Sequence, residues 1–209
     1  MNARIHPTAI IEKDVQIGAG SSVWDNVHIR HSTRIGEECV VGEKTYIAYD
    51  VCIGNRVKIN ALVYICTAVT IEDGVMISAG TVFTNDRFPR AATSDLKRLR
   101  PSEPDEDTLP TVVKEGATNG AGCTIGNDLV IGRFAMIGMG SLVTKSVPDF
   151  HLVIGHPATS VGCVCRCGQP LLRFPATGAP DGRREVACSA CNLRYAIEHG
   201  KVIELNPPA

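Results

Sequence analysis

Large apolar residues recur at every sixth position through the first part of the chain. Stepping by six from Ile5 to Phe83, fourteen consecutive positions carry Ile, Val or Phe, and thirteen of these residues are β-branched. A small or β-branched residue stands four places after each of the first thirteen, as Ala9 and Val15 do. Apolar residues at the three-and-four spacing of a helix do not recur. The six-residue period therefore predicts short strands and tight turns in a parallel β-helix.

Glycines often follow these apolar positions directly. Gly18, Gly36, Gly42 and Gly54 are examples. Because glycine adopts backbone conformations that other residues avoid, we expect these glycines to let the chain bend between strands.

The period is interrupted once. It stops at Phe83 and resumes at Val113, thirty residues later, which is a multiple of six. Residues 84–112 are therefore predicted to project as one long loop from a corner of the coil, with the chain re-entering in register. The loop is charged and proline-rich, as an exposed segment should be, and it is either a solvated insertion or a functional element. Long loops in compact domains are often functional, so we favour the second interpretation. After the loop the six-residue positions are Val113, Asn119, Ile125, Ile131, Ile137 and Val143, with Asn119 as the one polar member.

Composition narrows the class of protein. The chain has 209 residues, a net charge of −1 and 44% hydrophobic residues, which fits one main body with a small appendage. The near-neutral charge gives no support for binding to nucleic acid or to a membrane surface. We expect no membrane span and no signal peptide. Nine cysteines without an export signal favour the reducing cytoplasm, and metal binding before disulfides.

The periodicity ends in the tail, residues 161–209, where cysteines come in pairs. Cys165 and Cys167 precede Gly168, and Cys188 and Cys191 precede Asn192. Gly and Asn tolerate the positive φ that a metal-binding knuckle needs after its second thiolate. The spacing predicts a zinc-ribbon-like module in which four thiolates hold a structural Zn²⁺ with no open coordination position. The metal would supply the folding energy of so small a module. Cys163 in place of Cys165, free thiols or an artefactual disulfide are the alternatives.

Several sequence blocks resemble a known superfamily. The repeats, the single loop and the closing segment KSVPDFHLVIGHPA (145–158) are similar to the left-handed β-helix acyltransferases with hexapeptide repeats. More narrowly, IHPTAIIEKDVQIGAGSSVWDNVHIR near the start and FTNDRFPR (83–90) resemble N-acetyltransferases of nucleotide-linked 3-amino sugars. Those enzymes act on UDP-2-acetamido-3-amino-glucuronate or on dTDP-3-amino-3,6-dideoxyhexoses. The resemblance covers roughly residues 3–160 and defines a transferase domain over 1–160.

This resemblance implies an activity and an assembly. The chain would transfer acetyl from acetyl-CoA to the 3-amino group of a UDP- or dTDP-linked sugar, for surface polysaccharide such as O-antigen. Three chains would form a homotrimer, with acetyl-CoA and the sugar in grooves between subunits.

The resemblance also carries roles for particular residues. Asn85 would offer an amide to the sugar or the carbonyl, and Asp86 would accept a hydrogen bond from the amine, although both are also ordinary turn formers. His28 is a candidate general base or sugar contact, with packing as the alternative. Substrate contacts are expected from Trp24, Lys58, Asn60, Tyr64, Arg87 and Arg90. Acetyl-CoA contacts are expected from Gly138, Gly140, Ser141, Lys145, Gly155, Pro157 and Ala158.

Other functions remain open at this stage. A different acyl acceptor, such as serine or another amino sugar, is the main alternative, and a β-helix scaffold without activity is another. A γ-class carbonic anhydrase needs three converging histidines, but only His28 and His31 lie in the coils after the first repeat.

Overall fold

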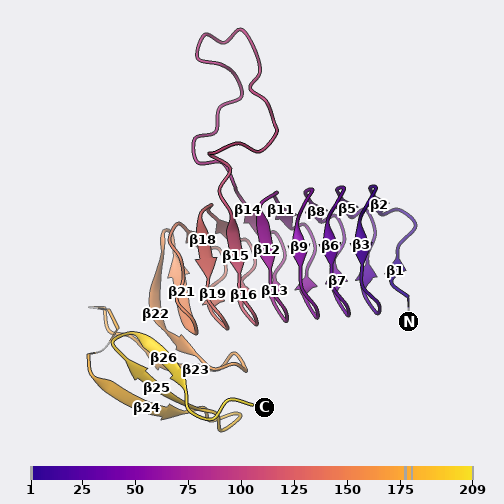
Figure 1. The fold of residues 1–209 in the computed structure, drawn as a ribbon. Helices are drawn as coiled ribbons and strands as arrows, with labels where there is room; N and C mark the ends of the chain where they lie inside the picture. The colour runs from indigo at the N-terminus through magenta and orange to yellow at the C-terminus, as the bar shows by residue number, and fades with distance from the viewer. Residues whose placement is uncertain (1, 177, 180, 209) are drawn as a thin grey trace.

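Three parallel sheets wind around one core in the computed structural model, which describes residues 2–176, 178–179 and 181–208 (Figure 1). Paired positions advance by three six-residue repeats, as in Arg4 with Ser22 and Gln16 with Arg34. Three repeats therefore complete one coil, and the predicted parallel β-helix is confirmed. Within the described residues, no helix is long and apolar enough to cross a membrane.

Each coil contributes one short strand to each sheet. The ten-stranded sheet holds, in order, β1 (Arg4–Ile5), β4 (Ser22–Val23), β7 (Val40–Val41), β10 (Lys58–Ile59), β13 (Met76–Ile77), β16 (Thr118–Asn119), β19 (Met136–Ile137), β21 (His151–Gly155), β22 (Ala158–Val164) and β23 (Pro170–Arg173). The seven-stranded sheet holds β2 (Ile10–Ile11), β5 (His28–Ile29), β8 (Tyr46–Ile47), β11 (Tyr64–Ile65), β14 (Val82–Phe83), β17 (Thr124–Ile125) and β20 (Leu142–Val143). The six-stranded sheet holds β3 (Gln16–Ile17), β6 (Arg34–Ile35), β9 (Cys52–Ile53), β12 (Val69–Ile71), β15 (Thr111–Val113) and β18 (Leu129–Ile131).

The core is a stack of the six-residue positions found in the sequence. From Val23 onward these side chains point inward and are buried, while the preceding residue of each strand faces outward. Asn119 takes its predicted place in this core, where it is fully buried. Its side-chain nitrogen and oxygen have no hydrogen-bond partner.

The glycines that follow the apolar positions were predicted to bend the chain, but their structural role is different. A Cβ on Gly36 would lie 2.6 Å from the carbonyl oxygen of Gly54 on the next coil. These glycines therefore let neighbouring coils approach, and the expectation that they bend the chain is wrong. The bends occur two residues after them, where Glu38, Lys44 and Arg56 adopt positive φ.

The loop leaves the coil after β14 and returns at β15. Val113 pairs with Ile71 across the insertion in the same way that Ile71 pairs with Ile53 on the coil before, so the re-entry in register is confirmed. We call residues 84–110 the projecting loop (Figure 1). Antiparallel bridges between Asp86 and Thr108 and between Ala92 and Leu99 hold its two arms together.

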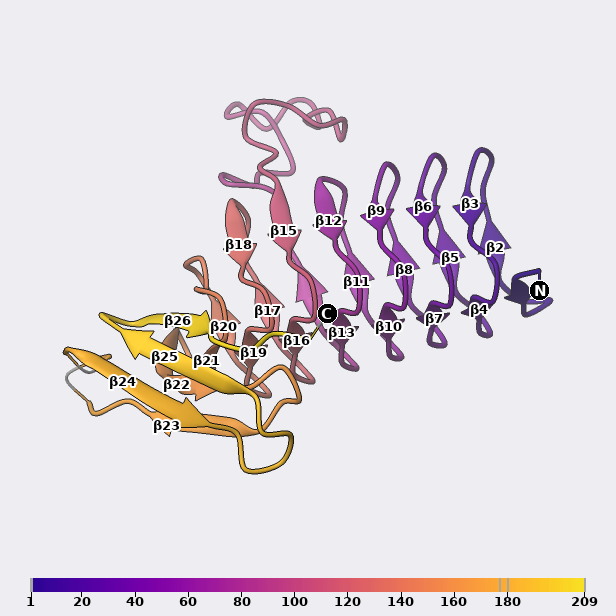
Figure 2. The ribbon, with the colours of Figure 1, turned by 60° about the horizontal axis from the view of Figure 1, so that its bottom comes forward.

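The tail packs beside the last coils. β21 and β22 form an antiparallel hairpin at the edge of the ten-stranded sheet, and β23 extends it. The predicted boundary at residue 160 thus falls inside β22. Strands β24 (Arg183–Ala187), β25 (Arg194–Glu198) and β26 (Lys201–Glu204) form a fourth sheet, which is antiparallel and lies against the C-terminal end of the coil (Figure 2). We call residues 165–205 the C-terminal module.

Candidate functional site

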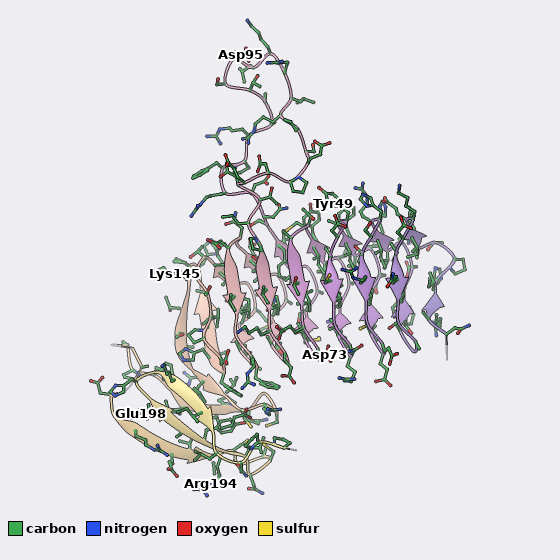
Figure 3. All side chains as sticks on the ribbon, viewed as in Figure 1. Tyr49, Asp73, Asp95, Lys145, Arg194 and Glu198 are labelled. Carbon is green, nitrogen blue, oxygen red and sulfur yellow. The ribbon has the colours of Figure 1, made fainter. Side chains whose placement is uncertain are left out.

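A cavity of about 310 Å³ lies where the projecting loop meets the coil. Figure 3 shows Tyr49 on the side of the coil from which the loop projects and Asp73 on the opposite side. The coil lines the cavity with Tyr46, Ala48, Tyr49, Tyr64, Cys66 and Thr67. The loop lines it with Asn85, Asp86, Phe88, Pro89, Arg90, Arg100, Pro101, Ser102, Glu103, Pro104, Asp105, Asp107 and Thr108.

Tyrosines from successive coils form the floor of this cavity. Tyr46 and Tyr64 are paired neighbours on β8 and β11, and their rings stack with centroids 5.4 Å apart and 6° between planes. Tyr64 keeps 44% of its surface exposed, which leaves a ring face for a ligand. Burial raises the pKa of the Tyr64 phenol, and it raises the pKa of the neighbouring Cys66 thiol to about 12. Both groups are therefore neutral near pH 7 and can only donate or accept hydrogen bonds.

The loop brings Asn85 and Asp86 to the cavity, as the sequence predicted. The Asn85 backbone is held by the Leu109 N–H, which donates to its carbonyl oxygen at 3.0 Å. The Asn85 side-chain amide donates only a long bond of 3.4 Å to the Thr67 carbonyl. This amide is thus available to a ligand, while Asp86 is exposed at the base of the loop.

The charge of the cavity is predominantly negative. Asp86, Glu103, Asp105 and Asp107 line it together with two arginines, Arg90 and Arg100. Arg100 is already paired with Asp105, at 3.5 Å. A cavity with an excess of carboxylates attracts a cationic group more readily than an anionic one.

A polar network on the first coils leads toward the cavity. The Glu12 carboxylate pairs with Arg30 Nε at 2.6 Å and His28 Nε2 at 2.9 Å, and it accepts a bond from the His31 N–H. Although partial burial favours its neutral form, hydrogen bonds from Arg30, His28 and His31 lower the pKa of Glu12 to about 2. Arg30 also donates to the Tyr46 hydroxyl at 3.0 Å. This network holds Tyr46, and so the floor of the cavity, in place.

His28 itself lies outside the cavity lining. Its ring contacts Tyr46 edge-on at 5.4 Å, and one nitrogen is occupied by Glu12. Within one chain, His28 is therefore one residue away from the cavity, and its predicted role as a base stays a prediction.

The residues predicted to contact the substrate lie in several separate regions of the structure. Tyr64 and Arg90 line the cavity, whereas Trp24 and Asn60 line a shallow hollow at another corner of the coil. The Trp24 ring is covered on one side by the Arg4 guanidinium, 5.0 Å from its centroid. Lys58 is exposed on the outer face of the ten-stranded sheet, and Arg87 stacks on Phe88 at the edge of the loop.

The residues predicted for acetyl-CoA gather mostly at the C-terminal end of the coil. The Gly138 N–H donates to the Val153 carbonyl, and the Gly155 N–H donates to the Ser141 hydroxyl at 3.2 Å. Ser141 is buried, so its hydroxyl is engaged within the fold. Gly140 faces open space. Pro157 and Ala158 are at the turn between β21 and β22, and Lys145 is exposed after β20 (Figure 3).

Four cysteines converge in the C-terminal module. The sulfur atoms of Cys165, Cys167, Cys188 and Cys191 all lie within 4.8 Å of one another. Gly168 and Asn192, which follow the two pairs, adopt positive φ as predicted. The N–H groups of Ala190 and Cys191 lower the pKa of the Cys188 thiol to about 6, so this thiol is ready to act as a thiolate. Cys163 is buried in a different apolar cluster, so the structure favours Cys165 as the fourth member of the set.

Sequence reasoning missed several residues of the cavity. Tyr46, Tyr49, Cys66, Arg100 and Glu103 line it, and Glu12 and Arg30 support it. The sequence did contain a signal for Tyr46. Tyr46 and Tyr64 are separated by one complete coil, and outward residues at that spacing stack on the same face.

Comparisons with known proteins agree with this fold. The family model described as bacterial transferase hexapeptide (six repeats) matches residues 14–49. A dTDP-3-amino-3,6-dideoxy-alpha-D-galactopyranose 3-N-acetyltransferase of Aneurinibacillus thermoaerophilus is 40% identical over 95 residues, which are 46% of this chain and 45% of the relative. Serine acetyltransferase 4 of Arabidopsis thaliana is 44% identical over 52 residues, or 25% of this chain and 15% of the relative. The matches thus span less than half of the length of either relative.

Solved structures share the architecture at low sequence identity. The product of the BC4754 gene of Bacillus cereus has a TM-score of 0.55 and 21% identity, with 76% of this chain and 85% of that chain covered. AntD, an N-acyltransferase from Bacillus cereus solved in complex with dTDP and 3-hydroxybutyryl-CoA, has a TM-score of 0.53 and 21% identity, with 79% and 82% covered. The chain therefore carries a transferase hexapeptide repeat and shares its β-helix fold with an acyltransferase.

Proposed function

We propose that the protein is an acetyl-CoA-dependent N-acetyltransferase that acts on the 3-amino group of a nucleotide-linked sugar. The observation that carries this proposal is the cavity that the projecting loop forms over the coil, with Asn85 and Asp86 at its edge. The similarity over 95 residues to a dTDP-3-amino-sugar acetyltransferase supports the substrate class, and dTDP is the nucleotide to test first. Surface polysaccharide assembly would use the acetylated sugar.

The reaction requires a neutral amine, a stabilised oxyanion and a proton acceptor. The carboxylates of the cavity attract the sugar ammonium, which releases one proton to solvent to give the neutral amine. Asp86 accepts a hydrogen bond from this amine and orients it. The amine attacks the thioester carbonyl, and the Asn85 amide donates to the developing oxyanion. The C–N bond forms, the C–S bond breaks, and the amine proton passes to the departing thiolate.

The remaining contacts of the sugar nucleotide follow from the aromatic floor and the arginines. The exposed face of Tyr64 stacks on a base or sugar ring, and Arg90 and Arg87 pair with the diphosphate. Acetyl-CoA approaches the open backbone at Gly140, with the pantetheine arm near Gly138 and Gly155 and with Lys145 at a phosphate.

The active assembly in this proposal is a homotrimer of left-handed β-helices with its sites between subunits. Exposed apolar side chains support an interface on the outer face of the seven-stranded sheet and on the loop. Ile10, Tyr64 and Val82 lie on that face, and Phe88, Leu96 and Leu99 lie on the loop. A neighbouring chain that covers them would bring its own His28, Trp24, Lys58 or Asn60 toward the cavity.

The four cysteines form a structural zinc site in this proposal. With a Zn–S distance of about 2.3 Å, tetrahedral geometry separates the sulfur atoms by about 3.8 Å. The pairs Cys165–Cys191 and Cys167–Cys188 lie at 3.4 and 3.6 Å, close to that separation. Zinc with four thiolates has no position for substrate and supplies folding energy alone. In the residues that the structure describes, no two cysteines form a disulfide, and the location in this proposal is a reducing compartment such as the cytoplasm.

Serine is the second candidate acceptor, because a serine acetyltransferase is 44% identical over 52 residues. The test is release of CoA thiol from acetyl-CoA with a panel of dTDP- and UDP-linked 3-amino sugars and with serine. We expect turnover with one nucleotide sugar. Turnover with serine alone would mean that the acceptor is serine and not a nucleotide-linked sugar. The absence of turnover with all of them, in folded protein, would contradict the enzyme proposal.

For the site, Asn85→Ala should lower kcat about 10²-fold, as loss of an oxyanion donor does. Arg56→Ala on the opposite side of the coil is the matched control, since Arg56 pairs with Asp73 far from the loop.

A further inference from the structure

Aromatic rings connect the last coil to the C-terminal module. Phe134 and Phe150 come from the end of the coil and stack at 5.4 Å. Tyr195 of β25 is fully buried and packs edge-on against Phe150 at 5.6 Å. The Arg166 guanidinium lies 4.4 Å from the centroid of Phe134. Cys165 and Cys188 belong to the same buried cluster, so the thiolate site packs directly against the rings that join the two parts.

Charged groups cross the same junction. Arg166, which lies between two of the four cysteines, makes a two-pronged pair with Glu204 of β26, with one N–O distance of 3.1 Å. Arg133 of the coil reaches Glu204 at 3.6 Å and Asp149 at 3.4 Å. The Glu204 side chain is only 9% exposed, whereas Arg133 is 42% and Asp149 is 43% exposed, so only the Glu204 end of this network is shielded from solvent.

A buried histidine makes a third link. His151 of β21 accepts a bond from the Ser160 hydroxyl on one ring nitrogen, and its other ring nitrogen donates to the Gly200 carbonyl at 2.6 Å. Gly200 lies in the turn between β25 and β26, so the histidine joins the β21–β22 hairpin to the module. The hairpin carries Gly155, Pro157 and Ala158 at its turn.

One hydrogen bond joins the four cysteines to this junction. The Tyr195 hydroxyl lies 3.1 Å from the sulfur of Cys165, and it accepts a bond from the Arg166 N–H at 3.1 Å. A metal-bound thiolate accepts a phenol hydrogen bond better than a neutral thiol, because it carries charge. Metal binding and the seating of Tyr195 therefore favour each other.

We propose that a divalent zinc ion on Cys165, Cys167, Cys188 and Cys191 acts as a clamp that holds the module and the β21–β22 hairpin on the end of the coil. This inference rests on the zinc site of the proposed function, and it adds a consequence for the coil. Without the ion, the two cysteine turns separate, Tyr195 loses its partner, the hairpin loses the support of Gly200, and Arg133 of the coil loses that of Glu204.

The experiment compares full-length protein with and without zinc by hydrogen exchange and metal analysis. We expect one zinc per chain. Removal with a chelator should speed exchange at least about tenfold in residues 151–174 and 183–204 and leave residues 22–83 unchanged. Equal protection with and without zinc, or equal loss throughout the coil, would overturn the clamp.

Three variants separate the clamp from a general loss of folding. Cys165→Ser should lose the zinc, whereas Cys163→Ala, also buried on the same stretch of chain, should retain it. Tyr195→Phe keeps the ring but removes the bond to sulfur, so zinc affinity should fall about 10- to 100-fold. Unchanged affinity in Tyr195→Phe would contradict the link between metal and junction. These readouts do not involve acetyl transfer, so a protein inactive on every acceptor would still test the clamp.

Discussion

The coil and the C-terminal module are stabilised in different ways. In the coil, each interior strand pairs with one strand of the turn before it and one strand of the turn after it. A column of inward-pointing apolar side chains lines the inner face of each sheet. At the module, longer strands are joined to the coil by a few groups that do not repeat. These are Phe150 at the end of the coil, and Tyr195, Arg166, Glu204 and four cysteines in the module.

The difference shows where single residues matter most. Repeat architectures derive stability from many similar neighbour contacts, so a defect in one coil is supported from both sides. A small module with little core depends on a few anchoring contacts, and in the proposed function also on a metal. Substitutions at the junction should therefore act locally and strongly, and substitutions in the coil should depend on how closely the coils approach.

The largest expected effect is at the junction. Phe150→Ala removes a fully buried ring that contacts both Phe134 and Tyr195 and should destabilise the module by about 3–5 kcal/mol. Urea denaturation followed at the module by hydrogen exchange measures it. Phe88→Ala, at a ring that is 65% exposed, is the control and should change stability little. Equal effects from the two variants would contradict the role of Phe150 at the junction.

A methyl group added between coils should have the next largest effect. Gly36→Ala places a Cβ 2.5–2.7 Å from backbone and side-chain atoms of Gly54 and Asn55, and should destabilise the coil by about 3 kcal/mol. The thermal midpoint of the whole coil measures this loss. Gly122→Asn is the control, because its Cβ meets nothing within 4 Å and Asn26 already adopts a similar positive φ. An unchanged thermal midpoint in Gly36→Ala would mean that neighbouring coils can move apart without loss of stability.

Asn119, the polar residue among the inward-pointing six-residue positions, should be replaceable with a gain in stability. Asn119 is fully buried without a partner, so Asn119→Leu should stabilise the protein by about 1–2 kcal/mol. Chemical denaturation of the two proteins measures the change. Loss of stability would show that the amide has a partner inside the coil.

The smallest effect is expected on the outer face of the first coils, at Glu12. The pKa of Glu12 is about 2 in the folded protein, below its ordinary value of 4.5, so the folded state binds this proton less tightly than the unfolded state. Its contribution to stability is complete above about pH 4.5 and is lost as the pH falls toward 2. Glu12→Gln should therefore lower stability at pH 6 and approach the parent protein at pH 2–3. A constant difference from pH 6 to pH 2 would contradict the low pKa.

These comparisons also show what the sequence could predict. The coil was predictable because every sixth side chain must be large, apolar and inward-pointing, and the thirty-residue gap preserved that count. The cysteine pairs were predictable from spacing, but the choice of Cys165 over Cys163 depended on where β22 ends.

The cavity was only partly predictable. Asn85 and Asp86 stand at the break of the repeat, but Arg100, Glu103 and Asp105 reach the coil through the path of the loop, which no periodicity describes. Tyr46 and Tyr49 face outward, where the core places no constraint on residue type. The glycines after the apolar positions were assigned to bends because their close contacts come from the neighbouring coil, which is distant along the sequence.

In the proposed function, the regular coil has no acceptor site until the projecting loop forms one. The most direct test replaces residues 87–107 with Asn-Gly, a two-residue turn that suits the antiparallel bridge between Asp86 and Thr108. On this proposal, the shortened protein is folded and zinc-loaded, and its acetyl transfer to the dTDP-linked 3-amino sugar falls at least about 10²-fold. Full activity in the shortened protein would contradict it.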